Sequence, residues 1–229
     1  ILRRIRLSLT DSALTSVREL SADLQIGMLA AIGTGEVESQ NLFATEARTA
    51  IDDVLSRLSA RNGERFLFSG DATATRPFGT ADELLDDVRA IAATATDEAD
   101  FAAQLDTYFD DPAGGFQTSF YRGAQTASDP DSVLGNQSAF ADVLRGLSVM
   151  ALSHTAQSVP FTGADSPALT TALERLERGR TELVNIQANV GMRSANLDNE
   201  LTLLEREQTL LNQAFTDLAG KDQFEAATQ

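Results

Sequence analysis

An apolar residue recurs at every seventh position through the last part of the chain, from residue 166 to the C-terminus. The positions are Leu169, Leu176, Leu183, Val190, Leu197, Leu204, Leu211 and Leu218. An unbroken heptad repeat of this length predicts one long helix. Ser166 and Pro167 are a suitable start, because the first helical turn does not need the N–H that proline lacks.

The flanking positions indicate how this helix packs. The second seam position of each heptad lies three residues after a stripe residue. At three of these positions, Arg193, Glu200 and Glu207, the side chain is charged, which fits a two-stranded zipper poorly. Further apolar residues widen the stripe, as in a helical bundle: Leu173, Leu201, Leu203, Leu210 and Phe215. We expect the stripe up to Leu204 in the core, and a possible assembly surface near the end at Leu211, Phe215 and Leu218.

The first 70 residues contain two further helical patterns. Apolar residues at three-and-four spacing predict a helix over 7–31, with Asp11 as a local interruption or cap, broken by Gly33 and Gly35. A second stripe from Ala47 to Leu58 precedes Asn62-Gly63, which can end that helix in left-handed geometry. Residues 66–68 form a short apolar run that predicts a strand.

Charge divides the chain into three parts. Residues 1–70 carry 8 basic and 9 acidic side chains, residues 71–165 carry 4 and 15, and residues 166–229 carry 6 and 10. We therefore expect a helical core from 1–70 and 166–229 and an inserted acidic outer domain from 71–165, where like charges face solvent. In the middle we expect helices over 81–95, 97–109 and 138–152 and a strand over 116–121. The predicted fold is mainly α, an antiparallel long-helix bundle with a small α+β outer domain.

Composition removes several function classes. The chain has no cysteine and one histidine, His154. It therefore offers no thiol and a single imidazole for catalysis or for binding a transition metal. The acidic groups Asp86-Asp87, Asp110-Asp111 and Asp129 with Asp131 lack the spacing of a calcium loop. A net charge of −16 disfavours nucleic acid and anionic membrane as partners. We expect no cofactor, no metal and no catalytic residue, and the chain is not predicted to be an enzyme.

Three short patterns resemble the flagellin-like family of axial proteins of the bacterial flagellum. They are Leu9-Thr10-Asp11-Ser12-Ala13-Leu14, the stretch Asn62-Gly63-Glu64-Arg65-Phe66-Leu67-Phe68-Ser69-Gly70, and Asn189-Val190-Gly191-Met192-Arg193. Their order and spacing match the family. The second pattern, ending Leu-Phe-Ser-Gly after a helix, is most similar to the hook-associated protein 3 branch, which forms the hook-filament junction.

This resemblance implies a structural role without catalysis. It implies a junction ring between hook and filament, with hook-associated protein 1, flagellin and further copies of the chain as neighbours. It also implies an extracellular location, reached through a flagellar export chaperone and the type III export apparatus without a cleaved signal peptide. The terminal assembly helices of the family are expected to be largely missing from this sequence.

Three alternatives remain open. Flagellin shares the expected bundle, and only Leu67-Phe68-Ser69-Gly70 favours the junction branch over it. A helical ligand-binding sensor would need flanking membrane spans. An enzyme would need a nucleophile, a base and an orienting group, which the sequence does not assemble.

Overall fold

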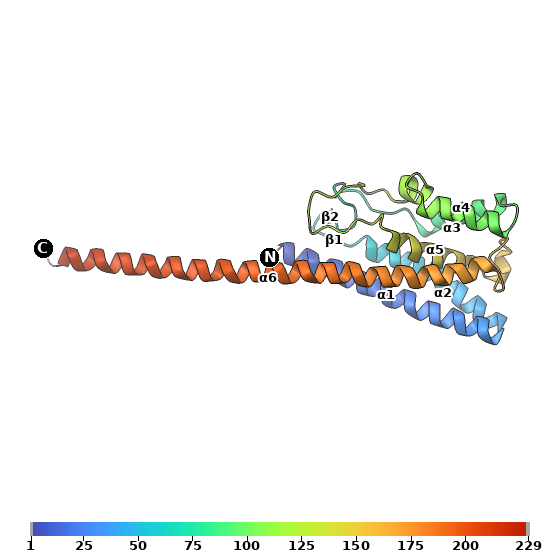
Figure 1. Ribbon diagram of the computed structural model, residues 1–229, viewed down its shortest axis with the longest axis horizontal. Coiled ribbons are helices and arrows are strands. Elements are labelled where there is room, and N and C mark those ends of the chain that lie inside the picture. Colours follow the sequence, from blue (N-terminus) through green and yellow to red (C-terminus); the bar gives the residue numbers. More distant parts are fainter. Residues whose placement is uncertain (1, 228–229) are drawn as a thin grey trace.

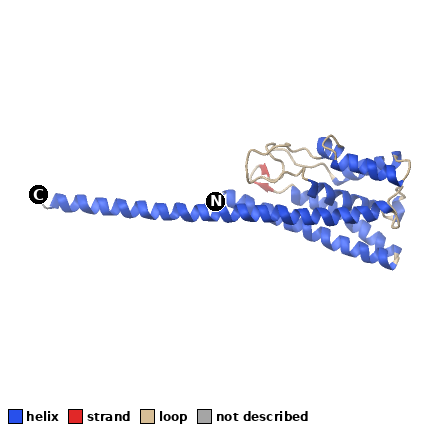
Figure 2. Ribbon diagram, in the orientation of Figure 1, coloured by secondary structure: helices blue, strands red, loops and turns tan. Residues whose placement is uncertain are grey.

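The structure, a computed structural model, describes the backbone of residues 2–227 and the side chains of residues 2–218. It is mostly helical, with one two-stranded hairpin and several loops (Figure 2). The α-helices are α1 (Leu2–Thr34), α2 (Val37–Leu58), α3 (Ala81–Thr94), α4 (Glu98–Asp110), α5 (Ser138–Leu152) and α6 (Pro167–Ala227), and the strands are β1 (Arg61–Asn62) and β2 (Arg65–Phe66). The predicted fold class, a mainly α bundle of long helices, is confirmed.

Four helices form the bundle. Helix α6 packs on α1 and α5, α1 also packs on α2, and α2 closes the arrangement against α5. The first and last helices run antiparallel, so the N-terminus lies beside the middle of α6 (Figure 1). Their apolar faces meet in one continuous core that includes Leu14 and Met28 of α1, Ile51 of α2 and Leu183 of α6. Hydrophobic burial along these faces is the main force that holds the bundle together.

The leucine stripe of α6 divides into two parts. Leu169, Leu176, Leu183, Val190 and Leu197 are at most 7% exposed, because α1 and α5 cover them. Leu204, Leu211 and Leu218 are 59–60% exposed, because α6 continues beyond the N-terminal end of α1 (Figure 1). The expectation that Leu204 belongs to the core is therefore wrong. The helix itself begins as predicted at Pro167, where Ser166 Oγ accepts a hydrogen bond from the Leu169 N–H.

The α1–α2 hairpin and the strands correct two details. Helix α2 begins at Val37, ten residues before the predicted stripe, and ends at Leu58. Asn62-Gly63 does not end that helix. Instead Gly63, at φ 63°, lies at the first loop position of the β1–β2 hairpin, where a two-residue turn requires a positive φ.

Helices α3 and α4 lie on the outer side of α5 (Figure 1). The predicted ranges, 81–95 and 97–109, agree with the structure to within one residue at each end. Helix α3 begins with a capping box in which Thr80 and Glu83 bond each other's backbone N–H groups. The strand predicted over 116–121 is wrong, because Phe116–Phe120 is a π-helical turn. Phe116 and Phe120 both pack against Phe78, with ring centroids 6.2 and 5.9 Å away. In a strand, residues four apart would lie about 13 Å from each other, too far to share one ring, whereas a helical turn brings them together.

Candidate functional site

The Leu-Phe-Ser-Gly segment after β2 is a buried connection between the bundle and the loops beside it. Leu67, Phe68 and Ser69 are at most 6% exposed, and the Phe68 ring packs edge-on against Phe140 of α5 with centroids 5.7 Å apart. The Phe68 carbonyl accepts hydrogen bonds from the Gly135 N–H at 2.9 Å and from the Tyr121 hydroxyl at 3.0 Å. Burial raises the pKa of Tyr121 to about 12, so the hydroxyl stays a donor at neutral pH.

Ser69 and Gly70 complete this connection. The Ser69 carbonyl accepts from Ala124 N–H at 2.9 Å, and its hydroxyl donates to the Thr75 carbonyl at 2.6 Å. Gly70 has φ 58°, and a Cβ there would lie 2.4 Å from the Thr126 carbonyl oxygen. Glycine is therefore required twice over, by backbone conformation and by space. Because Ser69 is buried and its hydroxyl is engaged, the segment positions the loops and offers no exposed nucleophile.

Four arginines converge on the loop 129–132. Arg3 forms an ion pair with Asp131, and Arg6 and Arg65 reach Asp129 Oδ2 at 3.0 and 3.3 Å. Two of the three sequence patterns meet at Ser132. There Arg65 Nη2 donates to the hydroxyl at 3.1 Å, and Arg193 Nη1 of α6 donates to the carbonyl at 3.3 Å. The four arginines are therefore Arg3, Arg6, Arg65 and Arg193.

The other pattern residues lie on α1 and α6. Ala13 and Leu14 are core residues of α1. Asp11 is neither a cap nor an interruption, because α1 is continuous around it, and its Oδ1 lies 3.4 Å from Gln187 Nε2. Asn189 donates to the Asn185 carbonyl of its own helix at 3.0 Å. Gly191 is exposed, and no heavy atom of a neighbouring segment lies within 4 Å of a Cβ built on it.

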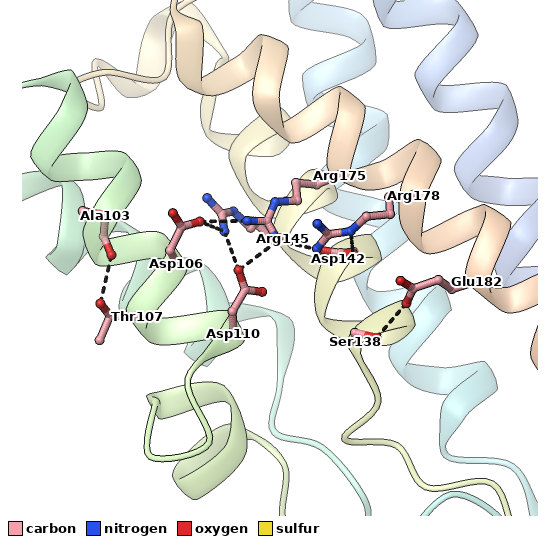
Figure 3. Close-up of polar contacts among 10 residues, drawn as sticks. All are labelled: Ala103, Asp106, Thr107, Asp110, Ser138, Asp142, Arg145, Arg175, Arg178 and Glu182. Atoms are coloured by element: carbon pink, nitrogen blue, oxygen red, sulfur yellow. Dashed lines mark hydrogen bonds and ion pairs between the residues drawn. The ribbon is translucent and has the colours of Figure 1, made fainter.

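A network of three arginines and three aspartates joins α4 to the bundle (Figure 3). Asp142 of α5, 1% exposed, accepts from Arg178 Nε and Nη2 at 2.6 and 2.7 Å and from Arg175 Nη1 at 3.2 Å. Arg145 of α5, 2% exposed, donates to Asp106 of α4 at 2.6 Å. Arg175 bridges the two halves, with Nη2 2.9 Å from Asp106 Oδ1 and Nη1 2.9 Å from Asp110 Oδ2.

Sequence reasoning missed this network, although a signal was present. Asp142 and Arg145 are the only charged residues in α5, whose residues from Ala139 to Leu152 are all buried. A charged pair inside an apolar helix requires partners of opposite charge, because an unpaired buried charge is costly. Arg175 and Arg178, three apart on α6, are the partners of Asp142. Asp106 and Asp110 of α4 are the partners of Arg145.

The remaining candidate residues are engaged locally. His154 Nδ1 accepts from the Ala156 N–H at 3.1 Å, and so caps the short helical turn Thr155–Gln157. Asp87 accepts from the Tyr108 hydroxyl at 2.6 Å, and burial together with this bond raises the pKa of Tyr108. Within residues 2–218 there is no group of three or more histidine or carboxylate side chains placed to hold a metal ion.

The end of α6 presents an apolar surface. Leu203, Leu204, Leu210, Leu211, Phe215 and Leu218 are each 58–69% exposed. We call residues 201–218 the projecting helix. The residues named from the sequence as a possible assembly surface, Leu211, Phe215 and Leu218, lie on it. An apolar surface of this extent is typical of a protein contact site. No helix in the described part of the chain combines the length and apolarity needed to cross a membrane.

Comparison with known proteins gives one structural likeness. The chain resembles the crystal structure of Bacillus cereus FlgL with a TM-score of 0.62, over 91% of this chain and 87% of that chain, at 15% sequence identity. At this identity the likeness shows a shared fold. No protein-family profile matches the sequence, and no curated protein sequence matches it.

Proposed function

We propose that this chain is a structural subunit of the bacterial flagellum that joins the hook to the filament. Two observations of different kinds support the proposal. The three sequence patterns resemble the flagellin-like family and its hook-associated protein 3 branch, and the fold resembles FlgL over nearly the whole of both chains. The fold likeness carries the proposal, because it covers 91% of this chain and 87% of the other.

The geometry suits a mechanical role. Helix α6 has 61 residues, which corresponds to about 90 Å of continuous helix at 1.5 Å per residue. One part of it is fixed in the bundle, and the projecting helix presents its apolar side chains to a neighbour. An element of this kind can transmit load along an axial assembly, because its backbone hydrogen bonds lie within the helix. No catalysis and no cofactor are part of the proposal.

The proposed core consists of residues 1–70 and 166–229, and the proposed outer part of residues 71–165. Helix α5 lies within the outer range by sequence but packs on α2 and α6 in the bundle. We therefore propose that α5 belongs to both parts, with α4 attached to it through the arginine–aspartate network and α3 packed against it.

The proposed neighbours follow from this role. They are hook-associated protein 1, flagellin and further copies of the chain in a ring, with export through a flagellar chaperone and the type III apparatus to an extracellular location. Nucleic acid and membrane are not proposed as partners.

Deletion of the gene in its own organism tests the proposal. We expect cells that build hooks, release flagellin into the medium and carry no filaments, with filaments restored by the full gene supplied in trans. Loss of the filament subunit itself would identify the chain as flagellin instead. Normal filaments in the deletion strain would refute both roles.

A further inference from the structure

A groove lies between α1 and α2, on a part of the bundle that the proposed function does not use. Its volume is about 380 Å³. Apolar side chains form the floor, and polar and acidic side chains form the rim; the lining residues are Leu20, Asp23, Leu24, Phe43, Thr45, Glu46, Thr49, Ala50 and Asp53. Grooves of this size with apolar floors are common binding sites.

The floor is pre-formed. Leu24 and Ala50 are 6% and 3% exposed, so they are anchored in the core, whereas Leu20 and Phe43 are half-buried and accessible from the groove. The Phe43 ring rests on Gly27 of α1, where a Cβ would lie 2.2 Å from it. This close contact brings α1 and α2 together beneath the ring and fixes its position.

The rim is negatively charged on both sides. Asp23 of α1 and Glu46 and Asp53 of α2 are exposed, and none of the three forms an ion pair with any side chain in residues 2–218. Leu42, 54% exposed, precedes Glu46 by four residues and so lies on the same face of α2. The surface therefore combines an apolar centre with uncompensated carboxylates at its edges.

We infer that this groove binds a basic amphipathic helix of a partner protein. Its apolar side chains would cover Leu20 and Phe43, and its lysines or arginines would pair with the rim carboxylates. Glu46 and Asp53 are seven residues apart, which is two helical turns or about 10 Å. The ligand helix therefore carries basic residues at a seven-residue spacing on one flank of its apolar stripe.

A second copy of this chain is a poorer occupant. The projecting helix carries three acidic residues, Glu205, Glu207 and Asp217, against one basic residue, Arg206, so its net negative charge would face the acidic rim. The basic start of α1 is already engaged, because Arg3 pairs with Asp131 and Arg4 lies 3.4 Å from Asp198. Charge therefore favours a different, basic partner, and the inference does not depend on the junction role.

Fluorescence anisotropy with a labelled model peptide tests this inference on the full chain. The probe is a helical peptide of about 18 residues, with leucine on one face and lysine on both flanks. We expect saturable binding, and a dissociation constant raised about tenfold or more by the double variant Glu46→Lys with Asp53→Lys. The matched control is Glu174→Lys with Asp165→Lys, which changes the net charge equally at exposed positions that do not line the groove.

Two further measurements separate the possible outcomes. A peptide with glutamate in place of lysine should not bind, and thermal melting by circular dichroism should show that both double variants remain folded. Equal weakening by the groove and control variants would mean general charge attraction and would overturn the inference. Concentration-dependent dimerisation of the chain alone, lost in the groove variant, would overturn it in favour of a second copy.

Discussion

Two glycines of α6 provide a test of how closely α5 and α6 approach. Replacing an internal helical glycine with alanine favours the helix by about 1 kcal/mol. Gly191 has no neighbouring atom within 4 Å of a built Cβ, so Gly191→Ala should keep the whole gain. At Gly179 a Cβ would lie 2.8 Å from the Ala139 carbonyl oxygen and 3.1 Å from Asp142 Cβ. These atoms of α5 move only with the helix that carries them.

The difference between the two variants isolates the steric cost. Both gain the same helix propensity, so it cancels, and overpacking of a well-packed contact costs about 1–3 kcal/mol. We therefore expect Gly191→Ala to unfold at higher urea concentration than the wild type, and Gly179→Ala to be less stable than Gly191→Ala by about 1–3 kcal/mol. The midpoints of thermal unfolding should separate by about 2–4 °C for each kcal/mol.

Urea unfolding followed by far-UV circular dichroism measures both effects with the wild type as reference. Equal stabilisation by the two substitutions would refute the close packing of α5 on α6. Destabilisation by Gly191→Ala would show that a neighbour contacts the exposed face of α6 at that point.

Three further predictions concern the network, the capping box and the projecting helix. Asp142→Asn should lower the free energy of unfolding by about 1–3 kcal/mol, because it leaves a buried amide facing arginine donors; an unchanged urea midpoint would contradict this. A backbone hydrogen bond from Thr80 lowers the pKa of Glu83 below its ordinary value of 4.5. The ionised Glu83 side chain should therefore stabilise the fold above pH 4.5, and this contribution should be lost as the pH falls through the lower pKa of the folded state. The difference in free energy of unfolding between wild type and Glu83→Gln should therefore shrink as the pH falls from about 6 to about 3, and a difference that does not change with pH would contradict this. Leu211→Glu with Phe215→Glu should change the free energy of unfolding by no more than about 0.5 kcal/mol yet abolish filament formation in cells. Leu183→Ala, in the core, should instead lower the free energy of unfolding by about 2–5 kcal/mol. A large loss of stability in the surface variant would mean that Leu211 and Phe215 are buried.

Much of the helical framework could be predicted from the spacing of apolar residues. Ser166 and Pro167 predicted the start of α6. The heptad repeat predicted its unbroken course, because one face of a long helix must stay apolar wherever it is packed. The same repeat could not show where packing stops. Leu197 and Leu204 are equivalent in sequence, but α1 covers the first and does not reach the second. Whether a leucine of α6 is buried depends on how far α1 extends beside it, and the spacing of apolar residues along α6 does not reveal this.

The candidate site was only partly predictable for a related reason. The pattern around Phe68 and Gly70 was recognised, but its role in holding the loop near Ala124 depends on contacts distant in sequence. The π-helical turn at Phe116 was mistaken for a strand, since a short aromatic run suits either structure until Phe78 is placed beside it.

The pairing of the first helix with the last has a consequence for how the chain reaches its native state. The apolar face of α1 is covered by α6, and Arg3 at one end of the chain lies 3.4 Å from Glu200 near the other. Contacts of such large sequence separation require most of the polypeptide to be present before they can form. A chain that emerges from its N-terminus therefore cannot complete this core step by step. The part of α1 that packs on α6 stays uncovered until α6 is present, so this contact of the core forms last.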